Sequence, residues 1–162
     1  MKKLKLIAFL ITCVVSQYAI ANNNDQLTLE YSINSSWNKP QFRQYTSINK
    51  NLETSYQKQN ATLIIIESLC PQCKHVTQEQ VNQLNNNTAN GITAALIKVA
   101  GNNAIYQLSS SRKGVDLRQL RFFHNGRFYE IQLGVNRSAK KSELIKLERE
   151  FLMLVSSIRI KD

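Results

Sequence analysis

"TLIIIESLCPQCKHVTQEQ", residues 62–80, joins a short apolar run to two cysteines that are two residues apart, and then to a polar stretch with helical character. The run from Thr62 to Ile66 is continuous and rich in β-branched residues, which predicts a strand covered on both faces because neither side of it meets water. A helix is expected from Lys74 to about Asn87. The cysteine pair is therefore expected at a strand-to-helix junction.

Two cysteines three positions apart at the start of a helix have a specific chemistry. The first, Cys70, would lie near unpaired backbone N–H groups and the positive end of the helix dipole, which favours the thiolate. The second, Cys73, would lie close enough to resolve a mixed disulfide. Pro71 suits a first helical turn because its missing N–H costs nothing there. Lys74 adds nearby positive charge.

Two other interpretations of the cysteine pair stay open on these residues. A Cys-x-x-Cys disulfide closes a very small loop and constrains the unfolded chain little, but a non-catalytic protein can still keep it as a structural disulfide. A zinc site needs about four ligands, and the histidines of the chain are His75 and His124. We predict no metal and no cofactor, and treat His75 as a residue that could tune the thiolate.

The segments on either side of this stretch are also predicted to be strands and helices. A first strand or extended arm is indicated by alternation from Leu27 to Ile33. A helix over about 41–58 follows Pro40, because apolar residues recur there at steps of three and four: Phe42, Tyr45, Ile48, Leu52 and Tyr56. Residues 92–100 are strand-like, the next three form a turn signal, and 104–108 are expected to form a short helix.

The C-terminal part gives the clearest local pattern. Asn125-Gly126 tolerates the positive backbone angles of a tight type I′ turn, and both flanks, 120–123 and 127–135, are strand-like. A long amphipathic helix is expected over about 138–157. Alternating strands and helices followed by a hairpin predict an α/β fold, a mixed sheet with helices on both faces.

A strand that runs into Cys70-Pro71-Gln72-Cys73-Lys74 and then into a helix resembles the active-site segment of thioredoxin-like proteins. The resemblance covers about residues 60–155. It implies a thioredoxin-like mixed sheet flanked by helices, and an oxidoreductase that acts on protein thiols or disulfides, with Cys70 attacking and Cys73 resolving. The residues that would tune the thiolate or line the substrate groove are Pro71, Gln72, Lys74, His75 and Arg118.

The chain departs from this family in two ways. The buried acid that many thioredoxins keep in the strand before the cysteines is missing from residues 63–66, and Glu67 lies nearer the motif. Thioredoxin-like enzymes place a cis-proline before the hairpin, whereas the prolines here are Pro40 and Pro71, and Arg118 stands near the matching position. This departure supports an alternative function, a non-catalytic thioredoxin-like envelope protein that binds a partner and keeps a structural disulfide. An alternative fold is the α+β type of PsbP and Mog1, which also ends in a hairpin and a long helix with a pattern resembling residues 157–160.

The first residues resemble a secretory signal peptide, with a lysine-rich head, an apolar run over residues 6–15 and a small-residue cleavage site at Ala19-Ile20-Ala21. We expect a signal peptide at 1–21, an N-terminal extension or first strand at 22–40, and the thioredoxin-like domain at 41–162. The apolar run is too short to span a membrane. Cleavage would remove Cys13 and lower the formal charge from +10 to +7, because three lysines and no acid leave.

A periplasmic or secreted location follows from that leader. The remaining basic residues are scattered rather than grouped into a long run, which is typical of a solvated basic surface. The expected partner is therefore a protein substrate or an envelope protein, with no nucleic acid and no stable membrane span after cleavage.

Overall fold

The computed structural model describes residues 28–45, 51–86, 91–110 and 114–161. Two helices are described, α1 (Gln78–Asn86) and α2 (Lys141–Ser157). The strands are β1 (Leu29–Glu30), β2 (Gln41–Tyr45), β3 (Asn51–Lys58), β4 (Ala61–Leu69), β5 (Thr93–Val99), β6 (Asn102–Ser110), β7 (Val115–His124), β8 (Arg127–Asn136) and β9 (Arg159–Ile160).

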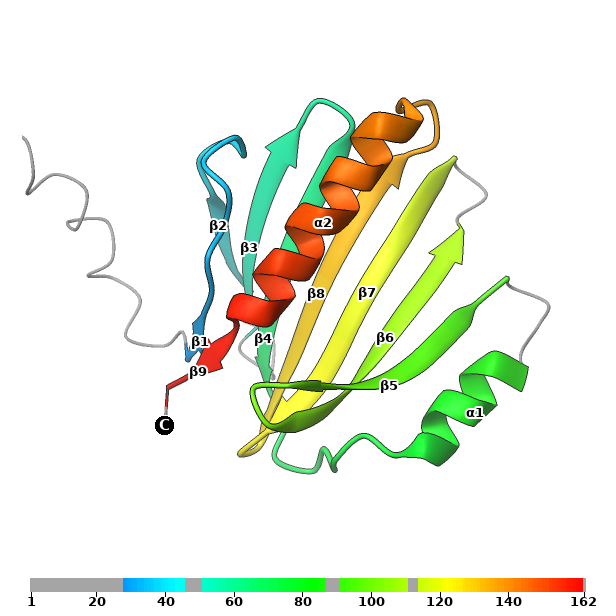
Figure 1. The fold of residues 1–162 in the computed structure, drawn as a ribbon. Helices are drawn as coiled ribbons and strands as arrows, with labels where there is room; N and C mark the ends of the chain where they lie inside the picture. Colours follow the sequence, from blue (N-terminus) through cyan, green and yellow to red (C-terminus); the bar gives the residue numbers. More distant parts are fainter. Residues whose placement is uncertain (1–27, 46–50, 87–90, 111–113, 162) are drawn as a thin grey trace, which may run out of the picture.

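Seven strands form one sheet in the order β2-β3-β4-β8-β7-β6-β5, and every neighbouring pair is antiparallel. Helix α2 crosses one face of this sheet, and α1 lies beside β5 at one end of it (Figure 1). The short strands β1 and β9 pair with each other. The fold is therefore α+β, with the helices separate from a meander-like sheet.

The predicted thioredoxin-like α/β fold is wrong. A mixed sheet needs at least one parallel pair joined by a crossover, and the strand pairs of the described residues are all antiparallel. Strand β4, which precedes the cysteines, pairs with β3 and β8, so both its neighbours run against it. The α+β class named as the alternative agrees with this topology.

The main core lies between the sheet and α2. Strands β7 and β8 contribute Leu120, Phe122, Tyr129 and Ile131, all fully buried, and the rings of Phe122 and Tyr129 stack with centroids 4.9 Å apart. The apolar stripe of the helix supplies Leu147, Phe151 and Leu154. The predicted C-terminal helix and its buried stripe are confirmed.

The hairpin predicted at Asn125-Gly126 is also confirmed. Both turn residues have positive φ, 45° and 71°, as a two-residue type I′ turn requires. A second tight turn at Ala100 and Gly101, again with positive φ at both residues, joins β5 to β6. The predicted strand at 92–100 is therefore confirmed as β5.

Two predicted helices are wrong, because both segments form strands. The helix expected over 41–58 is replaced by β2 and β3, with residues 46–50 outside the described part. Leu52 and Tyr56 are four positions apart. Residues with this spacing lie on the same face of a helix, and also on the same face of a strand. In β3 they lie on the α2 face with Thr54 between them, opposite the buried residues of β4. Pairing with β4 therefore overrides the apparent helical period.

The helix expected over 104–108 is strand β6. Ala104 and Tyr106 pair with Phe122 and Leu120 on the α2 face, while Ile105 lies on the other face. This alternation is the signal of a strand. The five-residue segment was too short for its period to be recognised without its partner strand.

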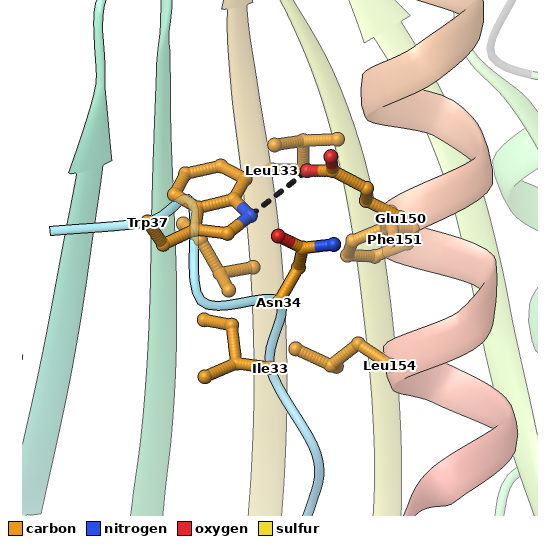
Figure 2. A pocket seen from close by; sticks show the side chains of 8 residues that line it. Ile33, Asn34, Trp37, Leu133, Glu150, Phe151 and Leu154 are labelled. Atoms are coloured by element: carbon orange, nitrogen blue, oxygen red, sulfur yellow. Dashed lines mark hydrogen bonds between the residues drawn. The ribbon is translucent and has the colours of Figure 1, made fainter.

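A polar cluster joins residues 28–40, the N-terminal segment, to this core (Figure 2). Trp37, the single tryptophan, is buried, and its indole N–H donates to the Glu150 carboxylate at 3.0 Å. The Lys58 ammonium lies 2.8 Å from the same carboxylate and 5.1 Å from the centre of the Trp37 ring. One buried acid thus joins the segment before β2 to β3 and α2.

We expect Glu150→Gln to lower the free energy of unfolding by about 2 kcal/mol, because a neutral amide leaves the Lys58 charge without its partner in a largely buried site. Urea denaturation followed by the fluorescence of Trp37 measures this change. The control is Glu148→Gln, two positions away, which removes a half-exposed pair with Arg118. An equal or larger loss in the control would contradict the prediction.

Candidate functional site

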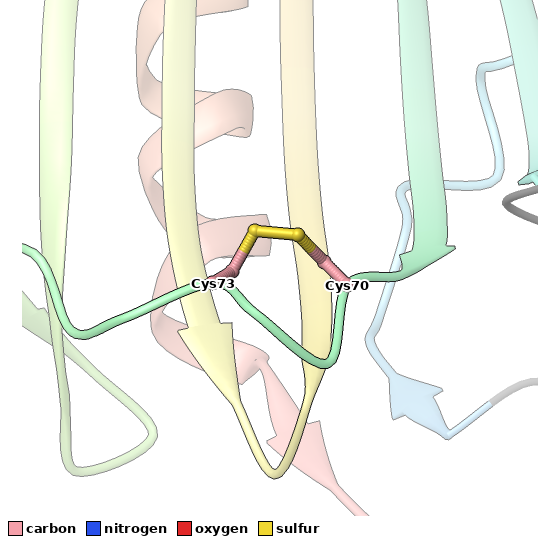
Figure 3. Close-up of a disulfide and its surroundings, with 2 residues drawn as sticks. All are labelled: Cys70 and Cys73. Atoms are coloured by element: carbon pink, nitrogen blue, oxygen red, sulfur yellow. A yellow bond between two sulfur atoms is a disulfide. The ribbon is translucent and has the colours of Figure 1, made fainter.

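The cysteine pair lies in the loop between β4 and α1, beside the end of the β7–β8 hairpin (Figure 3). Cys70 and Cys73 form a disulfide, with their Cα atoms 5.3 Å apart. The Cys73 N–H donates to the Cys70 carbonyl at 2.9 Å, which closes a turn. The Cys70 N–H donates to the carbonyl of Gly126 at 2.7 Å, so the loop is held against the hairpin turn.

The expected position of this pair at a helix start is wrong. Helix α1 begins at Gln78, five residues after Cys73. A capping box sets this start: the Thr77 hydroxyl accepts from the Gln80 N–H at 3.4 Å, and the Gln80 side chain accepts from the Thr77 N–H at 3.0 Å. Neither cysteine therefore receives the helix-end N–H groups that would favour a thiolate. The pattern Thr-x-x-Gln was the sequence signal for the true start.

The other predicted site residues divide into two groups. Pro71, Gln72, Lys74 and His75 are exposed in the loop around the cysteines, as the spacing implied. Arg118 lies elsewhere: it is six residues before the end of β7, roughly 20 Å from the hairpin turn at a strand's rise per residue. Its guanidinium pairs with Glu148 of α2 at 2.8 Å on the helix-covered face.

The identification as a thioredoxin-like protein is therefore wrong. Its two physical supports, the mixed sheet and the helix dipole at Cys70, are both absent from the described residues. What remains is a close cysteine pair in an exposed loop. The roles of Cys70 as the attacking thiol and Cys73 as the resolving thiol stay a prediction, of which the geometry shows only that the two sulfurs are close.

We expect the double substitution Cys70→Ser with Cys73→Ser to lower the free energy of unfolding by about 2 kcal/mol or less, because the closed loop spans only four residues. Chemical denaturation of the wild-type protein, oxidised and reduced, measures the same difference without a substitution. A loss of more than about 4 kcal/mol would show that this loop supports the main core.

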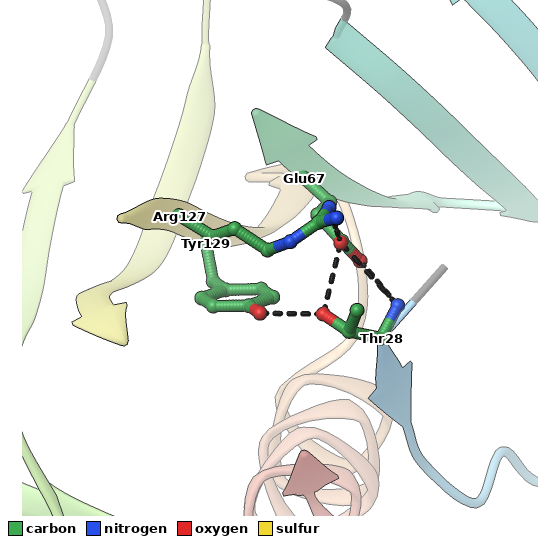
Figure 4. Close-up of polar contacts among 4 residues, drawn as sticks. All are labelled: Thr28, Glu67, Arg127 and Tyr129. Atoms are coloured by element: carbon green, nitrogen blue, oxygen red, sulfur yellow. Dashed lines mark hydrogen bonds and ion pairs between the residues drawn. The ribbon is translucent and has the colours of Figure 1, made fainter. Parts of the chain in front are cut away.

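A buried acid lies three residues before the pair (Figure 4). Glu67 is 1% exposed, and its carboxylate accepts from the Arg127 guanidinium at 2.6 Å and from the Thr28 backbone N–H at 3.0 Å. The Thr28 hydroxyl donates to the same carboxylate at 2.9 Å and lies 2.5 Å from the Tyr129 hydroxyl. Burial raises the pKa of Tyr129. The cluster fastens the N-terminal segment to β4 and β8, so Glu67 is satisfied as a structural anchor.

The face of the sheet opposite α2 is the second feature of the site. The apolar run of β4 was expected to be covered on both faces, but its burial alternates: Leu63 and Ile65 are buried beneath α2, whereas Ile64 and Ile66 are only half-buried. Helix α1 packs over the far part of this face, against Ile105 and Phe123. In the described residues, no helix lies over the part formed by β3, β4 and β8.

A hollow of about 580 Å³ occupies one end of this open face. Gly134 lies between Thr62 and Leu117 in the strand ladder, so no side chain fills that position. The walls are uncharged, mostly apolar or amide groups, apart from the Lys58 ammonium, which is already paired with Glu150. The walls include Gln57, Ile64, Leu117 and Gln132.

Two further properties hold for the part of the chain that the structure describes. None of its helices has the length and apolar content needed to cross a bilayer. No three histidine, cysteine or acidic side chains gather there closely enough to hold a metal ion.

The molecule is therefore an α+β domain with an antiparallel sheet, one helix-covered face and one partly open face. No family model and no curated protein sequence matches the chain. Among solved structures, the chain is similar to cyanobacterial PsbP (CyanoP) from Synechocystis sp. PCC 6803, with a TM-score of 0.42 and 11% sequence identity. That likeness covers 82% of this chain and 92% of the other.

Proposed function

We propose that this chain is a non-catalytic envelope protein that binds another protein through the open face of its sheet and keeps Cys70–Cys73 as a structural disulfide. The observation that carries the proposal is the half-buried pair Ile64 and Ile66 on a face that no described helix covers. An antiparallel sheet can leave one face in water, but that face is then normally polar. Isoleucines there are better explained by a partner than by solvent.

The chemistry of the hollow indicates what the partner offers. Its walls combine aliphatic groups, Ile64 and Leu117, with the amides of Gln57 and Gln132, and carry no unpaired charge. Amide side chains both donate and accept hydrogen bonds, as a peptide backbone does. An uncharged, extended segment of a protein with apolar side chains matches this surface, whereas an acidic or nucleic-acid partner would need free cations.

The location proposed for this protein is the periplasm or the extracellular space. It rests on the signal-peptide pattern of residues 1–21 and agrees with a disulfide, which persists in oxidising compartments. Fractionation of cells that express the tagged chain tests this part separately. Recovery in the cytoplasm with residues 1–21 still attached would overturn it.

Photo-crosslinking identifies the partner and the surface together. A benzoylphenylalanine placed at Gln132 should crosslink one protein in cells, and that protein is then purified for binding measurements. Gln132→Arg should weaken its binding at least tenfold, because a charge enters an uncharged interface. The same change in the cysteine loop, Gln72→Arg, is the matched control and should leave binding unchanged.

A variant without the disulfide distinguishes binding by the hollow from binding by the cysteine loop. Cys70→Ser with Cys73→Ser should leave binding of the purified partner within about twofold of the wild type, because the loop lies outside the hollow. Binding that is lost in the cysteine double variant and unaffected by Gln132→Arg would reverse the proposal and assign recognition to the cysteine loop.

A further inference from the structure

A separate cavity lies between α1 and the sheet, at the cysteine-loop end of the molecule. Its volume is about 370 Å³, within the range of pockets that hold small molecules. Phe123 and Phe128 form an aromatic wall with ring centroids 5.3 Å apart. The remaining walls are the apolar residues Val76, Leu84 and Ile105, two glutamines of α1, and Arg121.

Arg121 is the one charged residue of this wall, and its guanidinium is incompletely satisfied. One terminal nitrogen, Nη2, donates to the side-chain oxygen of Gln107. The Nε atom is buried and has no hydrogen-bond acceptor among the described residues. Buried donors of charged groups are rarely left without an acceptor, because the loss of water is then uncompensated.

The acid nearest to Arg121 in the ladder does not provide that acceptor. Glu130 is its cross-strand partner, but the Glu130 carboxylate accepts from the Gln119 amide at 3.2 Å and does not line the cavity. No ion pair of Arg121 occurs in the described part of the chain. Arg121 therefore brings a positive charge with no acidic partner among the described residues to the wall of a pocket whose other lining residues are uncharged.

We propose that this cavity binds a small aromatic carboxylate, whose carboxylate accepts from Arg121 and whose ring packs against Phe123 and Phe128. Arginine is suited to this role because its planar fork donates in fixed directions to a carboxylate. The apolar walls bury the ring, and the charge of Arg121 favours aromatic molecules that carry a carboxylate. This site is distinct from the hollow in which we place the protein partner.

The cysteine loop supports one wall of this cavity. Val76 follows Cys73 by three residues, is 1% exposed, and its carbonyl accepts from the Asn103 side chain at 3.1 Å. The hydrogen bond between Cys70 and Gly126 fixes the other end of the same loop. The disulfide thus constrains residues 70–76, which contact the hairpin turn at Cys70 and line the cavity at Val76.

Titration with 2-naphthoate, followed by NMR, tests the proposal on the chain from residue 22 onward. We expect saturable binding with intermolecular NOEs to the rings of Phe123 and Phe128. The neutral isostere 2-naphthamide should bind at least tenfold more weakly. Arg121→Gln should lower the affinity for 2-naphthoate about tenfold and leave the affinity for the amide unchanged.

The matched control is Arg118→Gln, on the same strand but on the helix-covered face, which should leave both affinities unchanged. If Arg121→Gln does not fold, Arg121→Lys is used instead. It keeps the charge without the planar guanidinium, and should lower the affinity for 2-naphthoate by a smaller factor. Equal binding of carboxylate and amide by the wild type, or no saturable binding of either, would overturn the proposal.

Discussion

Phe122→Ala should lower the free energy of unfolding by about 4 kcal/mol, the largest effect we expect from a single change. The Phe122 side chain is fully buried and stacks on Tyr129, and it lies directly beneath α2 with Leu120 and Ile131 around it. Truncation therefore removes a large apolar contact and leaves a cavity in the centre of the core. Urea unfolding monitored by Trp37 fluorescence gives the value.

The adjacent Phe123 provides a control, because successive side chains of β7 point to opposite faces of the sheet. Phe123 points to the opposite face, where it is only half-buried against Phe128. We expect Phe123→Ala to cost at most half as much as Phe122→Ala, because less apolar area leaves water. Equal losses at the two positions would contradict the register of β7 and the position of the core.

Glu67→Ala should lower the free energy of unfolding by about 3 kcal/mol. The substitution removes a buried carboxylate that accepts from the Arg127 guanidinium, the Thr28 hydroxyl and the Thr28 N–H, and the loss of the acid from such a buried charged network is strongly destabilising. We also expect the N-terminal segment to detach, since Thr28 loses its anchor. Faster hydrogen exchange at Leu29 and Ile160, which pair in the β1–β9 ladder, reports that detachment.

An exposed acid in the same ladder serves as the control for Glu67. Glu30 pairs with Lys161, but their side chains are 54% and 62% exposed. Such surface pairs contribute little, so Glu30→Gln should change the stability by less than about 1 kcal/mol. A loss at Glu30 as large as that at Glu67 would mean that the ladder, and not the buried acid, holds the N-terminal segment.

Elements with strong local signals were predictable from the sequence. Asn125-Gly126 specified its hairpin because few residue pairs tolerate two successive positive φ values, and the stripe around Leu147 and Phe151 specified α2. Strand β4 was also recognised, but its apolar run did not reveal that only one face is covered. A continuous apolar sequence is equally compatible with a strand whose second face is covered by another protein.

The errors concern residues whose structure depends on distant strands. Leu52 and Tyr56 fit two periods, and only the ladder with β4 decides between them. The cysteine spacing suggested a helix start, whereas the capping box at Thr77 and Gln80 placed the start several residues later. The anchoring role of Glu67 had no local signal, because its partners come from 39 and 60 positions away in the chain. Arg121 carried no local signal because the cavity forms only after α1 packs on the sheet.

Solvent accessibility of the methyl groups of Ile64, Ile65 and Ile66 shows whether one face of the sheet is open. NMR relaxation by a soluble paramagnetic agent, on the chain from residue 22 onward, reports how near the solvent each methyl lies. We expect slow relaxation for Ile65, beneath α2, and relaxation several times faster for Ile64 and Ile66, on the open face. Equally slow relaxation at all three would contradict this expectation, because the sheet would then be covered on both faces and the proposed binding surface would not exist.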